Sequence, residues 1–410
     1  MLTKIVEALE TSRVVALVGA RQTGKTSLAR RFETLERAFV TLDDLGPLSQ
    51  ANADPQGFVR ALAPVAIVDE IQRAPKLLLA IKAAVDRSRA KGQFLITGSA
   101  DLMALPALSD SLAGRMTMLE LFPLAQAEIE NRPCNVADSL FEPTHRWRAD
   151  PTTPQDAIHR VVRGGYPEAV YARDAKARDR WLASYLGAMI QRDVRDIADI
   201  TDASAIARLL ALIAARSART VNFTSLGSDA GIAKTTLLRY ISVLEQLFLI
   251  HRMPAWSLDL GRRLTKAPKL FVTDSGVAAH LMHADAARLI ADRNAFGGLL
   301  ETFVASELRK HASWSERQIS IYHYREQSGV EVDFLLESSS GESAAVEVKG
   351  TASPTSGDAS RLLKLMDDPK LGLVRGIVLH TGSDIVPIRE NVHGVPLSVF
   401  WTAASSTTAT

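Results

Sequence analysis

The stretch from Val14 to Arg30 constrains the fold more than any other part of the chain, because an apolar run, a glycine-bounded turn and a helical pattern follow one another. The turn fits G-x-x-x-x-G-K-[ST], the pattern of a phosphate-binding loop between a strand and a helix. Glycines let backbone N–H groups curl around phosphate oxygens, and the helix that opens at Gly24 adds the positive end of its dipole. The candidate nucleotide-binding residues are Gly19, Ala20, Arg21, Gln22, Thr23, Gly24, Lys25, Thr26 and Ser27.

Lys25 and Thr26 follow the second glycine of this turn and carry its polar chemistry. A lysine at this position reaches the β and γ phosphates of a nucleotide, and the adjacent hydroxyl binds the accompanying Mg²⁺. We therefore predict ATP and Mg²⁺ as ligands.

Two apolar segments downstream, residues 38–44 and 65–70, have the composition of buried strands and end in acidic residues. Apolar strands without alternation are typical of a parallel sheet covered by helices on both faces, where ligands bind at the carboxyl ends of the strands. Asp69 and Glu70 form the Walker B pair of this arrangement. We predict that Asp69 holds Mg²⁺ and that Glu70 polarises the water that attacks the γ phosphate.

A third apolar segment, residues 93–99, contributes two further candidates, Thr97 and Ser99. A hydroxyl at the end of a strand beside Walker B can sense the γ phosphate; the alternative is that it satisfies the turn backbone. Arg115 is a candidate arginine finger or sensor, because a guanidinium neutralises charge on the transferring phosphoryl group. An ordinary surface arginine is the alternative.

These motifs together resemble the AAA-type ATPase domain of a bacterial and archaeal family in which that domain precedes a conserved C-terminal domain. The resemblance continues through Gly164–Glu168, Gln191–Val194 and Glu331–Phe334. It implies an α/β P-loop AAA+ ATPase domain over residues 1–130 and leaves the oligomeric state open, since an arginine finger can act from a neighbouring subunit.

Composition limits the partners and the setting of this 410-residue chain. Its net charge is +2 and 23% of its residues are charged, so any surface for nucleic acid must be local. A single cysteine, Cys134, allows no intramolecular disulfide. The N-terminus carries acids where a secretory signal would be apolar, and no uncharged apolar run reaches about 18 residues. We expect a soluble, cytoplasmic protein without membrane segments.

The middle of the chain is predicted to be helical. Residues 131–200 comprise a polar linker and helices, and residues 201–260 give a helix, a short helix, a glycine-containing turn, a longer helix and a strand. This order is that of a winged helix-turn-helix. Its recognition helix would present Lys234, Thr235, Thr236 and Arg239 to DNA, although such folds also bind protein partners.

The last part of the chain, residues 261–400, contains carboxylates in unusual positions. Glu301 projects toward the apolar face of a predicted helix. Two predicted strands, residues 331–336 and 344–349, are joined by a polar turn; if that turn is symmetric about Ser340, Asp333 lies opposite Glu347. Facing carboxylates repel each other, so a cation between them would explain the pattern, and oxygen ligands favour Mg²⁺ or Mn²⁺.

Glu301, Asp333 and Glu347-x-Lys349 resemble the core of the PD-(D/E)XK nucleases, although Val332 stands where that motif usually has proline. The resemblance implies that the three carboxylates bind metal and that Lys349 orients the nucleophile or stabilises the pentavalent phosphate. The alternative for Glu301 is a position at the rim of the apolar helix face, from which its carboxylate reaches solvent. Residues 401–410 are predicted to be disordered.

The sequence therefore predicts an AAA+ ATPase coupled through a winged helix to a small α/β nuclease-like domain that acts on DNA. The alternative is an ATP-dependent switch that binds DNA or a protein partner and carries an inactive nuclease-like domain.

Overall fold

A computed structural model of the chain describes residues 1–62, 64–99, 112–142, 145–194, 202–326 and 329–402. It divides into two compact units, one made of Met1–Pro123 with Gln246–Phe248 and the other of Leu124–Glu245 with Leu249–Thr410. Each unit is described by itself below. The tail predicted to be disordered lies, from residue 403 on, outside the described residues.

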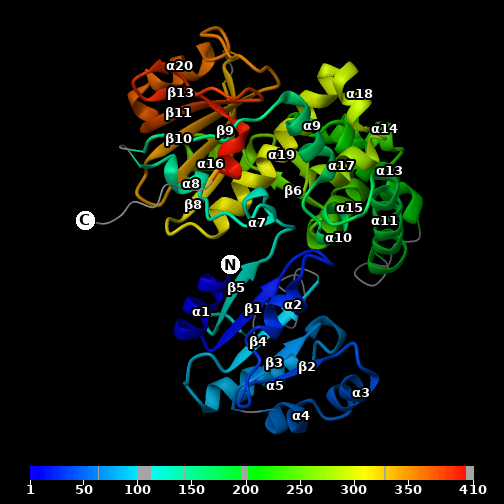
Figure 1. Cartoon of the computed structure of the whole chain (residues 1–410). Helices are drawn as coiled ribbons and strands as arrows, with labels where there is room; N and C mark the ends of the chain where they lie inside the picture. Colours follow the sequence, from blue (N-terminus) through cyan, green and yellow to red (C-terminus); the bar gives the residue numbers. More distant parts are fainter. Residues whose placement is uncertain (63, 100–111, 143–144, 195–201, 327–328, 403–410) are drawn as a thin grey trace. The chain divides into compact units, whose positions relative to one another are not determined.

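The first unit is built on a parallel sheet in the order β2-β3-β4-β1-β5 (Figure 1). Its elements are α1 (Leu2–Thr11), β1 (Val14–Val18), α2 (Lys25–Arg30), β2 (Ala38–Thr41), α3 (Leu45–Ala53), α4 (Pro55–Leu62), β3 (Ala66–Asp69), η1 (Ile71–Arg73), α5 (Leu77–Arg87), β4 (Phe94–Gly98) and β5 (Met116–Glu120). The apolar segments predicted to be strands are therefore present as β1, β2, β3 and β4.

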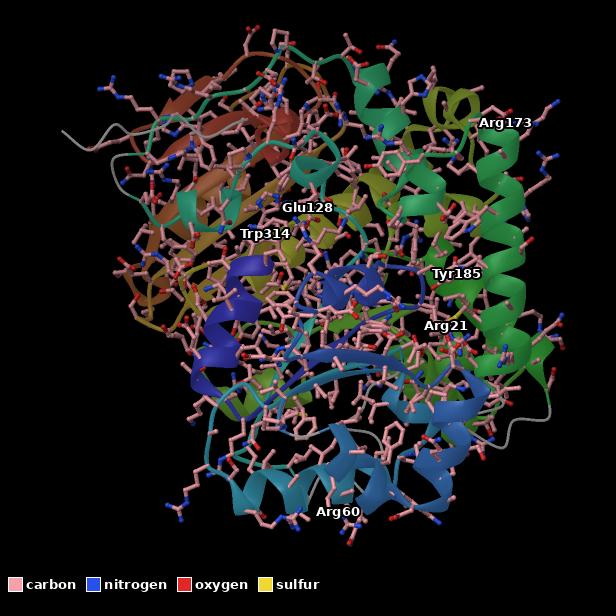
Figure 2. The ribbon with its side chains drawn as sticks, turned by 60° about the horizontal axis from the view of Figure 1, so that its bottom comes forward. Arg21, Arg60, Glu128, Arg173, Tyr185 and Trp314 are labelled. Carbon is pink, nitrogen blue, oxygen red and sulfur yellow. The ribbon has the colours of Figure 1, made fainter. Side chains whose placement is uncertain are left out.

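Both faces of this sheet are covered, which explains why its strands are apolar without alternation. Val15 and Leu17 of β1 pack in one cluster with residues of α1 and α2. Val14, Ala16 and Val18 pack in another with residues of α3, α4 and α5. Arg60 of α4 faces solvent on the outer side of this layer (Figure 2).

The second unit begins with helices. They are α7 (Gln126–Ile129), α8 (Val136–Ser139), α9 (Pro154–Arg163), α10 (Pro167–Val170), α11 (Ala175–Ala188), the π-helix η3 (Met189–Asp193), α13 (Ala203–Ala215), α14 (Phe223–Ala230) and α15 (Lys234–Gln246). Arg173, just before α11, extends into solvent, whereas Tyr185 of the same helix is buried (Figure 2).

An antiparallel pair of strands follows α15. The elements in order are β6 (Ile250–Met253), α16 (Leu260–Thr265), β7 (Lys269–Val272), α17 (Ser275–Leu281), α18 (Ala286–Ala291) and α19 (Arg293–Ser313). The order α13–α14–α15–β6 agrees with the sequence prediction. Gly231, in the turn between α14 and α15, adopts a left-handed conformation with φ of 68°.

A six-stranded mixed sheet completes the second unit, in the order β12-β13-β11-β10-β9-β8 (Figure 1). Its elements are β8 (Ile319–Arg325), β9 (Glu331–Ser338), β10 (Ser343–Lys349), α20 (Ser360–Met366), η4 (Pro369–Leu371), β11 (Leu373–His380), β12 (Val386–Arg389), β13 (Val392–Pro396) and η5 (Leu397–Phe400). Strands β9 and β10 pair as predicted, with Ser343 opposite Glu337 and Val346 opposite Phe334. This register is symmetric about Ser340.

Several described residues of the segment 131–155, predicted to be a linker or a surface excursion, are held against the end of the chain. The Cys134 thiol lies 2.9 Å from the carbonyl oxygen of Val399, Ser398 Oγ donates to the carbonyl of Asp150 at 2.7 Å, and Asp150 N donates to Thr402 Oγ1 at 2.8 Å. Two of these three hydrogen bonds use backbone groups of Asp150, which the composition of the segment cannot predict.

Gly164 and Gly165 allow three segments of backbone to approach one another. Leu124 N donates to Gly165 O at 2.8 Å, and Gly165 N donates to Asp274 Oδ2 at 2.7 Å. A Cβ atom on Gly165 would lie 2.3 Å from the carbonyl oxygen of Leu124. Close packing therefore explains why glycine stands here.

Candidate functional site

The phosphate-binding loop connects β1 to α2 in the geometry that its glycines permit. Gly24 is left-handed, with φ of 98°, and so is the non-glycine Gln22, with φ of 61°. A Cβ atom on Gly19 would lie 2.2 Å from the carbonyl oxygen of Leu121, so a side chain there would clash with the backbone. Thr23 Oγ1 closes the turn by donating to Ala20 O at 2.9 Å.

The side chain of Lys25 folds back into this loop. Its ammonium donates to the carbonyl oxygens of Gly19 at 2.9 Å and Ala20 at 2.7 Å, and the residue is only 4% exposed. Burial lowers the pKa of Lys25 to about 8, against the opposing influence of the Glu70 and Asp69 carboxylates. A polyanion in the loop would offer this ammonium stronger partners than two carbonyl groups.

We predict a pH dependence of ATP affinity from this lysine. Phosphates bind its charged form and raise its pKa, so binding takes up a proton once the free lysine is neutral. The affinity should be constant below the pKa of about 8, and then fall about tenfold per pH unit above it. Calorimetric titrations between pH 7 and 9.5 test this. Lys25→Arg, whose guanidinium stays charged over this range, should remove the dependence. An affinity of the parent chain that is constant over the whole range would contradict the prediction.

Asp69 lies at the centre of three hydroxyl groups at the carboxyl end of the sheet. Its carboxylate accepts hydrogen bonds from Thr26 Oγ1 at 3.0 Å, Thr41 Oγ1 at 3.1 Å and Thr97 Oγ1 at 2.6 Å. The parallel register places Thr41 beside Asp69. Two oxygens predicted to hold Mg²⁺, from Thr26 and Asp69, are therefore adjacent, and their hard-oxygen chemistry fits that ion.

Glu70 is held in a strained conformation directly after β3. Its backbone is left-handed, with φ of 57°, at a cost of roughly 1–2 kcal/mol for a non-glycine residue. Thr97 Oγ1 accepts from its N–H at 3.1 Å, while Ser99 Oγ, at 3.2 Å, and Gln72 Nε2 donate to its carboxylate. Thr97 and Ser99 thus orient the Walker B pair, and Thr97 also satisfies a turn backbone group.

Arg115 is not brought to this site within its own chain. Val14 N, at the first residue of β1, donates to its carbonyl oxygen at 3.1 Å, whereas the phosphate-binding loop follows the last residue of the same strand. Its guanidinium is paired with the carboxylate of Asp86, at 2.5 and 3.2 Å. A role as a finger or sensor in its own site therefore has no geometric support.

Sequence reasoning missed two residues of this site, Thr41 and Gln72. Thr41 is the last residue of β2, and the alignment of parallel strand ends was the available signal for its hydroxyl. Gln72 lies in the 3₁₀ turn after Glu70, where the sequence carries no sign of its contact.

The second candidate site is a carboxylate cluster in the other unit. The predicted residues come from different elements, with Glu301 on α19, Asp333 on β9, and Glu347 and Lys349 on β10. Asp333 Oδ2 accepts from Val348 N at 2.8 Å, and Lys349 Nζ donates to Glu347 Oε1 at 2.6 Å. These hydrogen bonds bring the hairpin residues together, and the charges of Asp333 and Glu347 act on the nearby Glu301 carboxylate of α19.

Lys269, which sequence reasoning missed, lies within this cluster. Its ammonium is 3.1 Å from Glu331, 3.8 Å from Glu301 and 4.0 Å from Asp333, and the residue is 1% exposed. Although burial opposes it, the charges of Glu301 and Asp333 raise the pKa of Lys269. A charged residue at the start of the apolar run Leu270–Val272 was the available signal.

Two ammonium groups, those of Lys269 and Lys349, do not balance the four carboxylates of Glu301, Glu331, Asp333 and Glu347. Burial and the neighbouring Asp333 raise the pKa of Glu301 well above its usual range and that of Glu347 to about 7; burial also raises the pKa of Asp333. We therefore expect the cluster to retain a proton at neutral pH. Among the described residues, no group of three or more His, Cys, Asp or Glu side chains has the geometry to hold a metal ion, and Lys269 provides the cation here instead.

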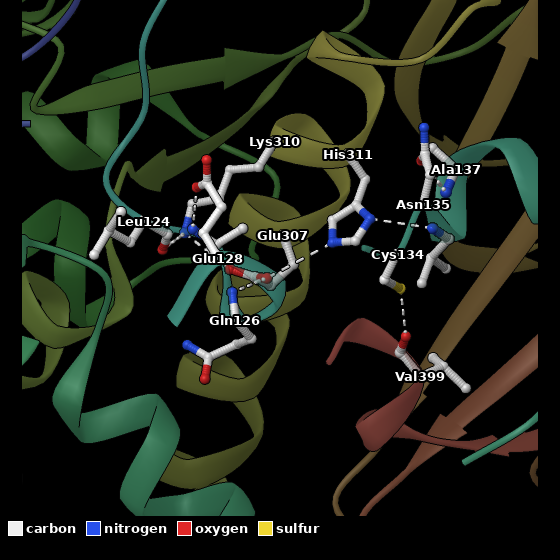
Figure 3. A network of polar contacts seen from close by, with 12 residues as sticks. Leu124, Gln126, Glu128, Cys134, Asn135, Ala137, Glu307, Lys310, His311 and Val399 are labelled. Atoms are coloured by element: carbon white, nitrogen blue, oxygen red, sulfur yellow. Dashed lines mark hydrogen bonds and ion pairs between the residues drawn. The ribbon is translucent and has the colours of Figure 1, made fainter. Parts of the chain in front are cut away.

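A further buried network lies on the C-terminal half of α19 (Figure 3). Lys310 Nζ donates to Glu307 Oε1 at 2.8 Å and to the carbonyl of Leu124 at 3.0 Å, while Gln126 N donates to Glu307 Oε2 at 2.9 Å. Burial lowers the pKa of His311 to about 3, and its Nδ1 accepts from Val136 N at 3.1 Å. His311 is thus neutral, and this network fixes residues 124–136 to the helix.

The recognition residues predicted for DNA lie at the start of α15. Lys234, Thr235 and Arg239 are exposed and Thr236 is partly buried, while Leu237 and Tyr240 of the same helix are buried.

Comparison with known protein families classifies the first unit. Residues 11–130 match the family model of the AAA domain. Together with the parallel sheet and the loop geometry, this match makes the first unit a P-loop domain of the AAA type. Residues 154–288 and 296–400 match two models that are each described as a domain of unknown function, DUF8612 and DUF4143 respectively.

Curated relatives match over most of the chain. The uncharacterized protein Rv2008c of Mycobacterium tuberculosis and the uncharacterized protein Mb2031c of Mycobacterium bovis are each 27% identical over 400 residues, covering 97% of this chain and 83% of theirs. Neither name states an activity.

Solved structures with partial similarity include a RuvB variant from Thermotoga maritima, with 22% identity, a TM-score of 0.30, and coverage of 62% of this chain and 88% of that one. AMPPCP-bound DnaA from Aquifex aeolicus has 13% identity and a TM-score of 0.28, with coverage of 60% and 85%. None of the helices in the described part of the chain combines the length and apolar character needed to cross a bilayer.

Proposed function

We propose that the chain binds ATP and hydrolyses it at the first unit. The observation that carries this proposal is the meeting of the Thr26 hydroxyl and the Asp69 carboxylate, 3.0 Å apart, beside a loop that buries Lys25. In this proposal Lys25 releases the loop carbonyls and binds the β and γ phosphates, while backbone N–H groups of residues 19–27 surround them.

The remaining residues act on the attacking water and the metal. Thr26 and Asp69 would hold Mg²⁺, which neutralises phosphate charge when it is bound. Glu70 accepts a proton from the water or polarises it, and Ser99, Gln72 and Thr97 keep that carboxylate and its backbone in place. Because Arg115 is bound to Asp86, an arginine finger for this site would be another arginine of the chain or one from a neighbouring subunit.

Phosphate release from ATP by the purified full chain tests this proposal. We expect turnover that requires Mg²⁺ and disappears with EDTA, and Lys25→Met should remove both turnover and ATP binding. Turnover that persists in Lys25→Met would identify a contaminating enzyme, and an intact chain that neither binds nor hydrolyses ATP would disprove the proposal. Mass measurement with and without ATP tests whether subunits associate.

A second proposed activity is metal-dependent phosphodiester cleavage by Glu301, Asp333, Glu347 and Lys349. It is favoured by the convergence of these residues from α19, β9 and β10, in the order that the nuclease motif requires. Mg²⁺ or Mn²⁺ held by the carboxylates would activate a water. Lys269 stands against it, since a metal would have to compete with its ammonium. The rival is an ATP-driven switch with an inactive cluster.

Incubation with plasmid and linear DNA, with Mg²⁺ or Mn²⁺ and with or without ATP, separates these two. Cleavage that is lost in Lys349→Ala, while ATP hydrolysis remains, would support the nuclease. Binding of the same DNA without cleavage would support the switch, and loss of that binding in Lys234→Ala with Arg239→Ala would place the contact on a winged helix formed by α13–α15, β6 and β7.

A further inference from the structure

A cavity of about 670 Å³ opens beside the N-terminal half of α19, within the second unit. Its wall is formed by the end of α13 and the residues after it, by α18 and by the first turns of α19, and Glu301 of the carboxylate cluster is among its lining residues. This volume lies within the range of about 300–1,000 Å³ that is typical of small-molecule sites.

Three arginines line this cavity: Arg219, Arg288 and Arg293. The two acidic residues of the lining are already engaged. Asp292 caps α19 by accepting from the N–H groups of Asn294 and Ala295, at 3.1 and 3.0 Å, and Glu301 lies 3.8 Å from the Lys269 ammonium. The lining of the cavity therefore carries an excess of positive charge, which favours an anionic ligand.

Two of the guanidinium groups are held in position by backbone carbonyls. Arg288 Nη1 donates to Met282 O at 3.0 Å and to His283 O at 3.2 Å, and Arg293 Nη1 donates to Gly350 O at 3.3 Å. Each guanidinium has five N–H donors, so most of them stay available. Arg219 is exposed and, within the described part of the chain, its side chain has no hydrogen bond or ion pair.

Two features of the backbone around the cavity would let a ligand approach it closely. Ala218, which precedes Arg219, is left-handed with φ of 71°, a conformation that costs roughly 1–2 kcal/mol for a residue with a side chain. Gly297 lies in the first turns of α19, where glycine costs about 1 kcal/mol relative to alanine. A Cβ atom there would meet no atom within 4 Å, so the protein's own packing does not require glycine.

We propose that this cavity is a binding site for a phosphoryl anion, either free or carried by a nucleotide. Guanidinium forks bind phosphoryl oxygens in pairs, and the lining combines two fixed forks with one that is unengaged. The bare helix surface at Gly297 leaves room for the body of the ligand. The site is separate from the phosphate-binding loop, because all its residues belong to the second unit.

Calorimetric titration of the full chain carrying Lys25→Met, without divalent metal, tests this proposal. Inorganic phosphate, AMP and a short single-stranded oligonucleotide are the three probes, and they distinguish a free anion, a nucleotide and a nucleic-acid backbone as the source of the phosphoryl group. We expect saturable binding of at least one probe, weakened about tenfold by Arg219→Gln through loss of a charge-assisted contact.

Two further variants keep the result interpretable. Gly297→Leu fills the cavity without touching an arginine and should prevent binding of the same probe, while Arg208→Gln, an exposed arginine of α13 outside the lining, should leave the affinity unchanged. Binding of no probe, or equal affinities in Arg219→Gln and the parent chain, would overturn the proposal. Because the phosphate-binding loop is disabled throughout, either outcome is independent of ATP hydrolysis.

Discussion

Glu70→Gln should lower the rate of ATP hydrolysis by about 10²- to 10⁴-fold while ATP still binds. The amide has nearly the shape of the carboxylate but cannot accept a proton from the attacking water. The surroundings of Glu70 stabilise an anion. Ser99 and Gln72 both donate hydrogen bonds to its carboxylate, and the carboxylate attracts the Lys25 ammonium electrostatically. The strained backbone at φ 57° holds that group in one direction.

The measurement is phosphate release at saturating ATP, together with ATP affinity by calorimetry. Glu36→Gln, a change of the same chemistry at an exposed site of the first unit, should be indistinguishable from the parent in both. Normal hydrolysis in Glu70→Gln would assign the base elsewhere. A parallel loss of ATP binding would show that the residue supports the site and does not act on water.

Lys269→Met should destabilise the second unit by about 3–5 kcal/mol at neutral pH, because it leaves buried carboxylates without their cation. Methionine keeps the length and apolar character of the side chain, so packing alone predicts a small effect. All five tryptophans of the chain, Trp147, Trp181, Trp256, Trp314 and Trp401, belong to this unit. Denaturant unfolding followed by their fluorescence therefore reports on it specifically.

The free energy of unfolding that Lys269→Met loses should increase with pH. The folded-state pKa values of Glu301, Asp333 and Glu347 are raised, so their contribution to stability is greatest below the unfolded values and is lost as pH rises through the folded ones, about 7 for Glu347. The deficit of Lys269→Met should thus be smaller at pH 5.5 than at pH 8. Lys269→Arg should retain most of the stability, and Lys269→Met combined with Glu301→Gln should recover part of it. Equal stability of Lys269→Met and the parent at pH 8 would contradict this account.

The parts of both sites that the sequence predicted are those whose geometry is local. The loop from Gly19 to Thr26 is set by its own glycines, and the pairing of β9 with β10 follows from a short turn centred on Ser340. Asp69 could be placed because parallel strands align their carboxyl ends. In each case a few adjacent residues determine the arrangement.

What could not be predicted depends on contacts between distant segments. Lys269 precedes Glu301 by more than thirty residues and meets the cluster only because β7 and α19 pack together, and nothing in a one-dimensional pattern measures that distance. Arg115 is the opposite case, a residue predicted at the site that the fold places elsewhere. Its position in the sequence suggested the phosphate site, but the direction of β5 places it at the opposite end of the sheet.

The network around Lys310 has a mechanical consequence for the second unit. The first unit ends at Pro123, and the carbonyl of the very next residue is already bonded to the helix that carries Glu301. The second unit is thus bonded to its own long helix from its first residue onward. Deleting residues 124–126 would therefore remove the backbone partners of Lys310 and Glu307 and give water access to an ion pair that is now buried.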